Sequence, residues 1–538
     1  MISQDGINLA VCVITAHFGD LVSKVCGCLL RRGSLSLQDI VRSTEFSSSQ
    51  VKNCLLVLIQ HNCVQAFCVP RGGAGGATKT VTQYMALFDN ILHRMRFSKF
   101  LAIVKGDLGG QCETLLQGLL RYGRLTFDQL MVRATSTQSE GSSCNVDALR
   151  KNFGKLVHGH YVERCPRPEP FIAPSEEAAP ARKRSSKFRE EILTLEQQAV
   201  IAASLTDAER FSEIPNTGTD TSVTEDKLDV TVGDKRKFEA AELDEDIEAT
   251  ISETEVLWRA NFQKFVFCLK KKVCVEKVRS RNGLDAGVVL EAIIESSEQE
   301  CDSRVYKDIE LNGCIHLCVI TIRPEFHFLA VRASMDSILE KVRGKPDGIS
   351  MTLELVRGIL EQLDCSSHTE DCNVYYTIEL QRIIESCRNV EVESLILARY
   401  GKDAFRIFGL LIGKGSPVET DQISDFTLVD KKVTQQVLYN LWKDDYLSMQ
   451  KVTLEGTGQR KDSFLWKLKK NSAWHLVLNH LYHAALNLNQ KITHIVEQEY
   501  EVLLSEEKLK QLKKSRMILE LSLLKLDDAI MIFHDFSA

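Results

Sequence analysis

Apolar residues recur at steps of three and four near the start of the chain, which predicts an amphipathic helix between Val11 and Leu29. Gly33 is expected to end this helix, since glycine commonly follows a helix C-terminus. Further along, the serines at 47–49 offer N-caps to another helix over 50–60. The pattern therefore predicts two well-defined helices in this part of the chain.

Shorter elements lie on either side of the helix at 50–60. A strand signal over 34–37 leads into a candidate helix over 38–42. Apolar segments over 63–69 and 81–88 are joined by the glycine-rich stretch 72–76, which predicts a β-hairpin with a flexible tip. A helix, a short strand, two helices and a hairpin together make a winged helix, a variant of the helix-turn-helix.

This unit recurs along the chain. The motif RRGSLSL at 31–37 has a counterpart, RYGRLTF, at 121–127, and the exits of the third helices correspond as well. Another copy lies near the C-terminus, where Leu441-Trp442 and Tyr446-Leu447 occupy equivalent places. Recurrence of a unit of this size predicts tandem winged helices.

A fourth, divergent copy is expected between 251 and 392. Its first helix is predicted over 258–269, its third helix over 351–363, and a wing strand over 374–380. The apolar segment 314–331 fits none of the elements of the unit.

The predicted fold is mainly α-helical with small β wings: about four tandem winged-helix domains followed by a C-terminal helical hairpin or coiled coil. The expected boundaries are 1–88, 89–166, 251–392 and 393–470 for the four winged helices, 167–250 for a charged insert, and 471–538 for the coiled coil. The insert opens with several prolines, is poor in aromatic residues and ends acidic, so it is predicted to be disordered or loosely helical.

Composition limits the classes of function. The formal net charge is -6, which argues against a protein that coats duplex DNA through charge alone. The 17 cysteines lie in apolar runs without a disulfide framework, which is typical of a reducing compartment. No signal peptide is expected, since the N-terminus has Asp5 and no basic stretch before its apolar residues. No membrane span is expected either, since the apolar segment 313–331 carries Arg323, Pro324 and Glu325 in its middle.

The sequence does not contain the motifs of a catalytic or ligand-binding site. The glycines at 72–76 lack the closing Gly-Lys-Ser/Thr of a phosphate-binding loop, and strands flank them on both sides. Cys314 and Cys318 have no second close pair, so core cysteines are favoured over a zinc site. No Ser-His-Asp arrangement or paired-carboxylate motif is found in the sequence. We therefore expect no enzyme activity, no cofactor and no metal.

Basic residues of the last wing form a candidate DNA contact, made by Arg460, Lys461, Lys467 and Lys469. Alternation in the strand places Phe464, Trp466 and Leu468 on one face, with Lys467 and Lys469 on the other. The same pattern also fits an edge strand that lysine protects against aggregation. Both interpretations remain open from the sequence.

A second basic cluster lies in the insert. Arg182, Lys183 and Arg184 form a tripeptide that is either simply solvated or part of a nuclear localisation signal. Because the insert is polar on both sides of the cluster, its sequence does not separate the two interpretations.

Several of these segments resemble one family. The stretch 51–69 with its LIQHN motif, the HFG at 17–19, and the YVERCP at 161–166 are similar to the winged-helix subunit of RNA polymerase III. So is the RYG at 399–401, which is followed by RIF at 406–408. The resemblance covers most of the chain and weakens over 279–345.

The resemblance implies a nuclear, non-catalytic subunit related to the large subunit of general transcription factor E. Such a subunit would anchor a three-subunit initiation subcomplex on the polymerase clamp. Its expected partners are the other polymerase III subunits, the TFIIIB initiation factor, and single-stranded or melting promoter DNA. Two alternatives are a sequence-specific regulator and a scaffold of the proteasome-lid or cullin type. The first would need a basic third helix, yet 50–60 contains only Lys52.

Overall fold

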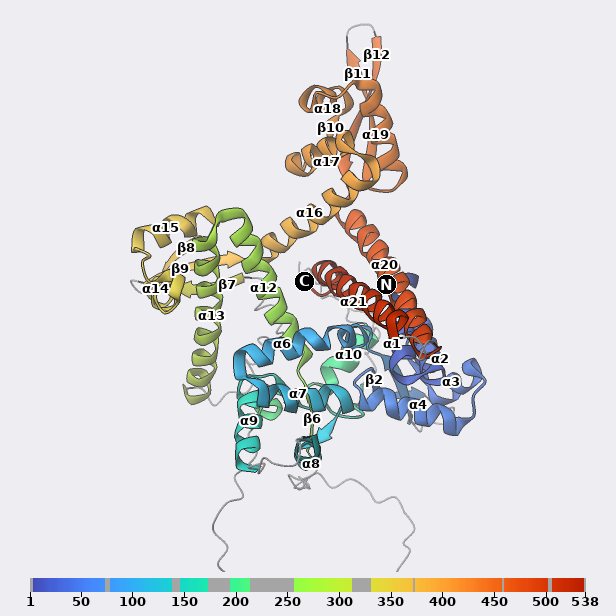
Figure 1. Cartoon of the computed structure of the whole chain (residues 1–538). Coiled ribbons are helices and arrows are strands. Elements are labelled where there is room, and N and C mark those ends of the chain that lie inside the picture. The colour runs from blue at the N-terminus through green and yellow to red at the C-terminus, as the bar shows by residue number, and fades with distance from the viewer. Residues whose placement is uncertain are drawn as a thin grey trace, which may run out of the picture. The chain divides into compact units, whose positions relative to one another are not determined.

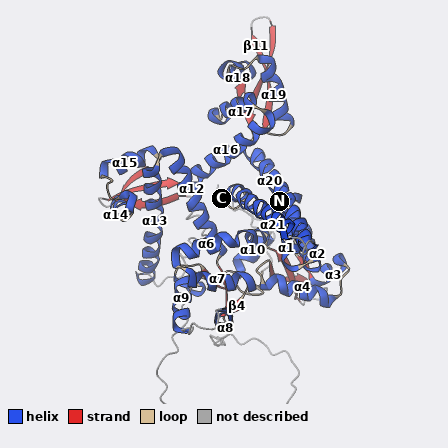
Figure 2. Cartoon of the chain, in the orientation of Figure 1, coloured by secondary structure: helices blue, strands red, loops and turns tan. Residues whose placement is uncertain are grey.

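Over the residues that it describes, the computed structural model shows four small β-sheets, each built from three antiparallel strands, within a largely helical fold (Figures 1 and 2). In every sheet the strand that comes last in the sequence lies between the other two. This shared order is that of a winged helix, so the predicted tandem arrangement is confirmed. The structure describes residues 3–72, 78–137, 146–172, 194–212, 256–311, 330–370, 373–456, 459–501 and 506–536.

The chain forms two compact units. One comprises residues 32–87 and 97–262, and the other comprises residues 1–31, 88–96 and 263–538. The first winged helix contributes elements to both units, because its first helix lies within residues 1–31 and its later elements lie within residues 32–87.

The N-terminal region contains two helices where the pattern predicted one. Helix α1 (Gln4–Phe18) ends at Gly19, and α2 (Asp20–Arg32) begins directly after it. Gly19 has φ 83°, a backbone conformation that glycine adopts without the steric penalty of a Cβ. The single-helix prediction is therefore wrong at this residue, although the apolar stripe continues through both helices.

The first winged helix then follows the predicted order. Its elements are β1 (Leu35–Ser36), α3 (Leu37–Thr44), α4 (Ser48–Gln60), β2 (Val64–Gly72) and β3 (Thr78–Ala86). Ser47 caps α4 through a capping box with Gln50, as the run of serines predicted. The glycine-rich tip at 73–77 lies outside the described residues.

The second winged helix is completed by a strand from the far side of the insert. Its elements are α6 (Phe97–Leu108), α7 (Gly110–Tyr122), β4 (Leu125–Thr126), α8 (Phe127–Thr137), α9 (Val146–His158), β5 (Val162–Arg164) and β6 (Leu257–Ala260). Strand β6 pairs with both β4 and β5. Its Trp258 is 1% exposed and meets the Phe153 ring edge-on, with 5.2 Å between the ring centroids.

The predicted helix over 258–269 is consequently wrong in its first part. Trp258 and Ala260 are buried while Leu257 is exposed, which is the two-residue period of a strand. The next helix, α12 (Phe262–Asn282), begins only after this strand.

Parts of the predicted disordered insert are ordered. The Cys68 amide donates to the Pro170 carbonyl at 2.9 Å, and the Ile172 amide donates to the Cys68 carbonyl at 3.0 Å, so this segment extends the first sheet. Helices α10 (Leu195–Ala203) and α11 (Asp207–Arg210) follow. Ile172 and Ala199 are buried with Phe67 and Met85, and this apolar contact explains why the prediction of disorder fails for 167–172 and 194–212. The remaining insert residues, 173–193 and 213–255, lie outside the described part.

The third winged helix uses a different first helix from the one predicted. It comprises α13 (Leu284–Leu311), β7 (Ala330–Ser334), α14 (Met335–Arg343), the 3-10 turn η3 (Pro346–Gly348), α15 (Leu353–Gln362), β8 (Ser366–Glu370) and β9 (Asn373–Glu379). The predicted third helix and wing strand are confirmed as α15 and β9. Of the apolar segment 314–331, only Ala330 and Val331 are described, and both lie in β7.

The C-terminal helices form the predicted hairpin. Helices α20 (Lys470–Glu501) and α21 (Glu506–Phe533) pack against each other, and α1 packs on α20. Helix α5 (Phe88–His93) and the 3-10 turn η1 (Arg94–Arg96) lie in the same unit. Helix α16 (Leu380–Tyr400) contacts both helices of the hairpin.

Candidate nucleic-acid interface

The predicted DNA-contacting residues belong to the fourth winged helix and to its junction with the C-terminal hairpin. Its elements are α17 (Lys402–Lys414), β10 (Val418–Glu419), α18 (Thr420–Thr427), α19 (Lys431–Lys443), β11 (Leu447–Gly456) and β12 (Gln459–Leu468). Buried Phe408, Leu411, Leu438 and Tyr446 form the centre of its core. This core supports the two long strands of the wing.

The position of β12 is fixed by Trp466. Its indole Nε1 donates to the Thr420 hydroxyl at 2.8 Å, and the side chain is 7% exposed. Val418 pairs with Trp466 on one side of the strand, and Met449 pairs with it on the other. Because Trp466 points into the core, the adjacent Lys467 is exposed on the opposite face, as the alternation predicted.

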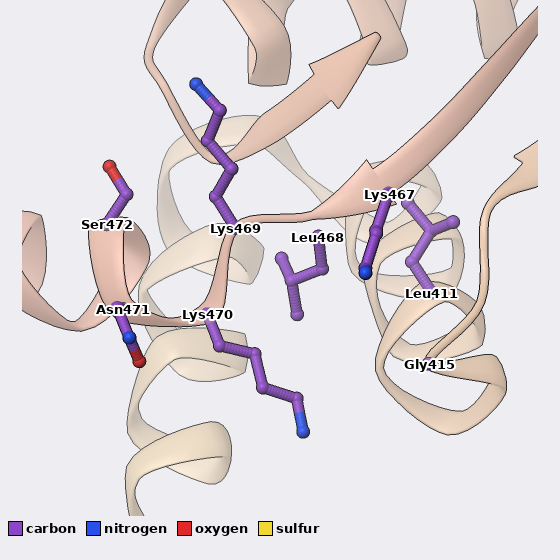
Figure 3. A pocket seen from close by; sticks show the side chains of 8 residues that line it. All are labelled: Leu411, Gly415, Lys467, Leu468, Lys469, Lys470, Asn471 and Ser472. Carbon is purple, nitrogen blue, oxygen red and sulfur yellow. The ribbon is translucent and has the colours of Figure 1, made fainter. Parts of the chain in front are cut away.

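Lys467 and Lys470 border a hollow of about 340 Å³ where β12 meets α20. Figure 3 shows both ammonium groups extending to the same side of the chain, with Leu468 between them. The lining consists of Leu411, Gly415, Lys467, Leu468, Lys469, Lys470, Asn471 and Ser472. Two cations beside an apolar floor, next to the N-terminal end of a long helix, suit a polyanion such as a phosphate backbone.

Lys469 lies differently from its neighbours. Strand β12 ends at Leu468, so Lys469 is not part of the alternating face, and its ammonium group extends to the opposite side of the chain from those of Lys467 and Lys470 (Figure 3). Its Nζ lies 2.6 Å from the Asp445 Oδ1, and Ser472 donates to the other oxygen of that carboxylate. The hydrogen bond from Lys469, and after it the one from Ser472, lowers the pKa of Asp445. The ion pair makes Lys469 a weaker candidate for a phosphate contact than Lys467.

Arg460 and Lys461 lie near the tip of the wing. The strand register pairs Arg460 with Glu455 and Lys461 with Leu454. Their side chains are outside the described part of the structure, as are Arg182, Lys183 and Arg184 in the insert.

Helix α19, which corresponds to the third helix of the unit, carries aromatic residues on its surface. Tyr439 is 56% exposed and Trp442 is 41% exposed, and their ring centroids lie 5.9 Å apart. Lys431 is ion-paired with Asp421 at 2.6 Å, which leaves Lys432 and Lys443 as further exposed cations on this helix. The aromatic pair was missed in the sequence, where Trp442 served only to align the repeats, although its spacing of three from Tyr439 was a usable signal.

The fourth winged helix is locally basic. Residues 401–470 contain 12 lysines and arginines against 9 aspartates and glutamates, whereas the whole chain has a net charge of -6. Among the described residues, no group of three or more His, Cys, Asp or Glu side chains is arranged to hold a metal ion. The helices described are also too short or too polar to cross a membrane.

Comparisons with known proteins identify the family. Three family models match the chain: the RNA polymerase III subunit RPC82 helix-turn-helix domain at residues 8–68, RNA polymerase III subunit RPC82 at 151–312, and the POLR3C C-terminal winged-helix domain at 392–468. The human DNA-directed RNA polymerase III subunit RPC3 is 23% identical over 500 residues, which cover 91% of this chain and 84% of the relative. The chain belongs to the RPC3-type winged-helix subunits of RNA polymerase III.

More distant relatives carry the same description. The RPC3 subunit of Danio rerio is 21% identical, with 90% of this chain and 83% of the relative covered. The rpc3 subunit of Dictyostelium discoideum is 20% identical, with 83% of this chain and 85% of the relative covered. An RPC3-type subunit is an accessory subunit of the polymerase rather than the catalytic one.

The LIQHN motif at 58–62, one of the segments that resemble this family, has a structural role in the RPC3-type fold. The Arg124 guanidinium Nε donates to the Asn62 side-chain oxygen at 2.9 Å, and the Arg124 amide donates to the Gln60 carbonyl at 2.9 Å. A Cβ at Gly123 would lie 2.0 Å from that same carbonyl oxygen, so the junction requires glycine. The LIQHN motif therefore joins the first and second winged helices.

Proposed function

We propose that this RPC3-type subunit anchors a three-subunit initiation subcomplex on the clamp of RNA polymerase III and contacts upstream promoter DNA during opening. The observation that supports the DNA contact is the locally basic wing and junction in a chain of net charge -6. Phosphate neutralisation by lysine and arginine supplies most non-specific affinity for DNA. A small local cluster favours contacts that other subunits hold in place.

The proposed setting is the nucleus, with the TFIIIB initiation factor and two further subunits of the subcomplex as partners. The family assignment supports this setting because the relatives are named as RNA polymerase III subunits. Arg182, Lys183 and Arg184 are proposed to contribute to nuclear import. Single-stranded or melting promoter DNA is the proposed nucleic-acid partner.

The test is a four-residue alanine variant of Arg460, Lys461, Lys467 and Lys469, assembled into the polymerase. Promoter opening is expected to slow, and each lost phosphate contact should flatten the plot of log affinity against log salt by about 0.7 to 0.9. Within the set, Lys467→Ala should have a larger effect than Lys469→Ala, since Lys469 is already paired with Asp445.

A matched control removes two exposed cations from α17 of the same domain, Lys402 and Arg406. This variant should open promoters at the normal rate. Because β12 is the central strand of its sheet, edge protection does not account for these lysines. Normal opening by the four-alanine variant at every salt concentration would contradict the proposed DNA contact.

A further inference from the structure

Helix α21 carries apolar residues on two opposite faces. Toward α20 it presents a continuous 3-4 repeat, and its Arg516 reaches Glu499 of α20 at 2.7 Å. The members of this inner repeat are Leu509, Leu512, Arg516, Leu519, Leu523, Leu526 and Ile530. A spacing of 3.5 residues per turn is the seam of a coiled coil, so this face is fully accounted for by the hairpin.

The opposite face has its own apolar group. Met517, Ile518 and Leu521 are 62%, 55% and 54% exposed. At 100° per residue, Leu521 lies about 180° from the inner position Leu512 around the helix axis. We call Met517, Ile518 and Leu521 the outer stripe. A helix with apolar residues on both faces is typically covered on both.

The charges around the outer stripe indicate what covers it. Apart from Arg516 of the inner repeat, residues 508–525 contain five lysines and a single acidic residue, Glu520, in a chain that is acidic overall. Lys514 and Lys525 continue the outer stripe at its two ends. Lys514 lies four residues before Ile518, and Lys525 lies four residues after Leu521, so both fit the 3-4 spacing of one helix face. Acidic residues on the same face, Glu507 and Asp528, occur only beyond these lysines.

We propose that an acidic amphipathic helix of another polymerase III subunit docks on the outer stripe. This inference rests on the proposed function because it takes the partner from the initiation subcomplex. Apolar residues of the partner would cover Met517, Ile518 and Leu521, and its carboxylates would pair with Lys514 and Lys525. A second copy of this chain does not fit, since either orientation would set these lysines against each other.

The proposal is tested by placing the photoreactive residue p-benzoylphenylalanine at position 517 of the full-length chain in purified, assembled polymerase. Irradiation is expected to cross-link this position to an aspartate- and glutamate-rich segment of one other subunit, identified by mass spectrometry of the joined peptides. A cross-link to DNA, to a second copy of the chain, or to nothing in an intact polymerase would overturn the proposal.

Paired substitutions provide the energetic test. Ile518→Glu with Leu521→Glu should lower recovery of the cross-linked subunit by about tenfold, since hot-spot residues dominate such interfaces. Ser515→Glu is the control, because it adds a carboxylate to an exposed position of the same helix outside the outer stripe. Lys514→Glu should likewise reduce recovery, whereas Lys508→Glu, which lies off the stripe, should not. Equal recovery for each variant and its control would overturn the proposal.

These results separate the inference from the function on which it rests. If the unaltered chain purified without any polymerase subunit, the proposed function itself would fail. If the polymerase assembled normally and the Glu variants behaved as their controls, only the docking surface would be wrong.

Discussion

A cluster of buried charges joins the linker at 88–96 to the end of the chain. The Arg96 guanidinium lies 2.8 Å from Asp527 and 2.7 Å from Asp535, and all three side chains are less than 5% exposed. His93 is also buried, with its Nδ1 at 3.0 Å from the guanidinium. Burial of charges costs free energy unless each finds a partner, so the cluster holds these two segments in one arrangement.

His93 makes this cluster sensitive to pH. Burial, and then the neighbouring Arg96 charge, lower the pKa of His93 from 6.5 to about 4. Between these values the unfolded chain binds a proton that the folded chain does not, so stability falls as pH decreases. We predict that His93→Gln will lose less unfolding free energy than the unaltered chain between about pH 7 and about pH 5, measured by urea denaturation.

The neighbouring His534 acts in the opposite direction. Burial lowers its pKa, but the hydrogen bond to Asp89 together with the negative charges of Asp535 and Asp89 outweighs this effect, and the pKa is raised overall. Its contribution to stability is present below the unfolded pKa and is lost as pH rises through the folded value. The control for His93→Gln is His475→Gln, which removes an exposed imidazole outside this cluster. If His93→Gln lost as much unfolding free energy between these pH values as the unaltered chain, the assignment of this pH dependence to His93 would be wrong.

Single residues of the candidate site were only partly visible in the sequence. Alternation along β12 correctly separated Trp466 from Lys467, because strand geometry is local. The pairing of Lys469 with Asp445 was not visible, since it depends on how the start of α20 meets the end of α19. The exposure of Tyr439 and Trp442 also depends on which side of α19 the core occupies.

At the scale of elements, local patterns predicted helices and hairpins well and long-range pairing poorly. The third helices and wing hairpins of the first and fourth copies were found because their signals are contiguous. Strand β6 was missed because it is only four residues long and pairs with β5 across the insert. No periodicity in a short window can identify such a partner.

This pairing yields a prediction for the second winged helix. Trp258→Ala should reduce the unfolding free energy of that domain by about 3–5 kcal/mol, since it removes a fully buried aromatic side chain from the core. Leu257→Ala is the matched control, because the adjacent side chain is 39% exposed. The measurement is hydrogen exchange of α7 and α9. Similar protection in both variants would show that β6 is not needed to close this sheet.

At the scale of the whole molecule, the uneven distribution of charge separates two proposed surfaces. Net charge -6 disfavours strong binding of free duplex DNA, whereas residues 401–470 and 508–525 each carry a basic excess. The first region is proposed to meet phosphates and the second a carboxylate-rich helix. The basic wing and the helical C-terminus could be predicted from the sequence. The outer stripe could not, because its exposure depends on which face of α21 packs against α20.

The C-terminal hairpin also supports the N-terminal helix α1, so removal of the hairpin should expose this helix. Gly6 of α1 lies against Tyr482 of α20, where a Cβ would come within 3.2 Å of the ring. Truncation after Lys470 removes this cover together with both carboxylate partners of Arg96, whereas residues 97–262 belong to the other compact unit. We predict weaker association with the other polymerase subunits and loss of hydrogen-exchange protection in α1, with α7 and α9 still protected.

A shorter truncation separates the contributions of the two helices. Ending the chain after Glu501 retains α20 and its contact with α1 but removes α21, including Asp527 and the outer stripe. Protection of α1 should then persist for the residues that face α20. Arg96 would lose both carboxylate partners, and because an unpaired buried charge is costly, the 88–96 segment should open. Association should still weaken, because the docking surface is gone. Normal co-purification of the polymerase subunits with both truncated chains would show that the hairpin supports only the fold and takes no part in assembly.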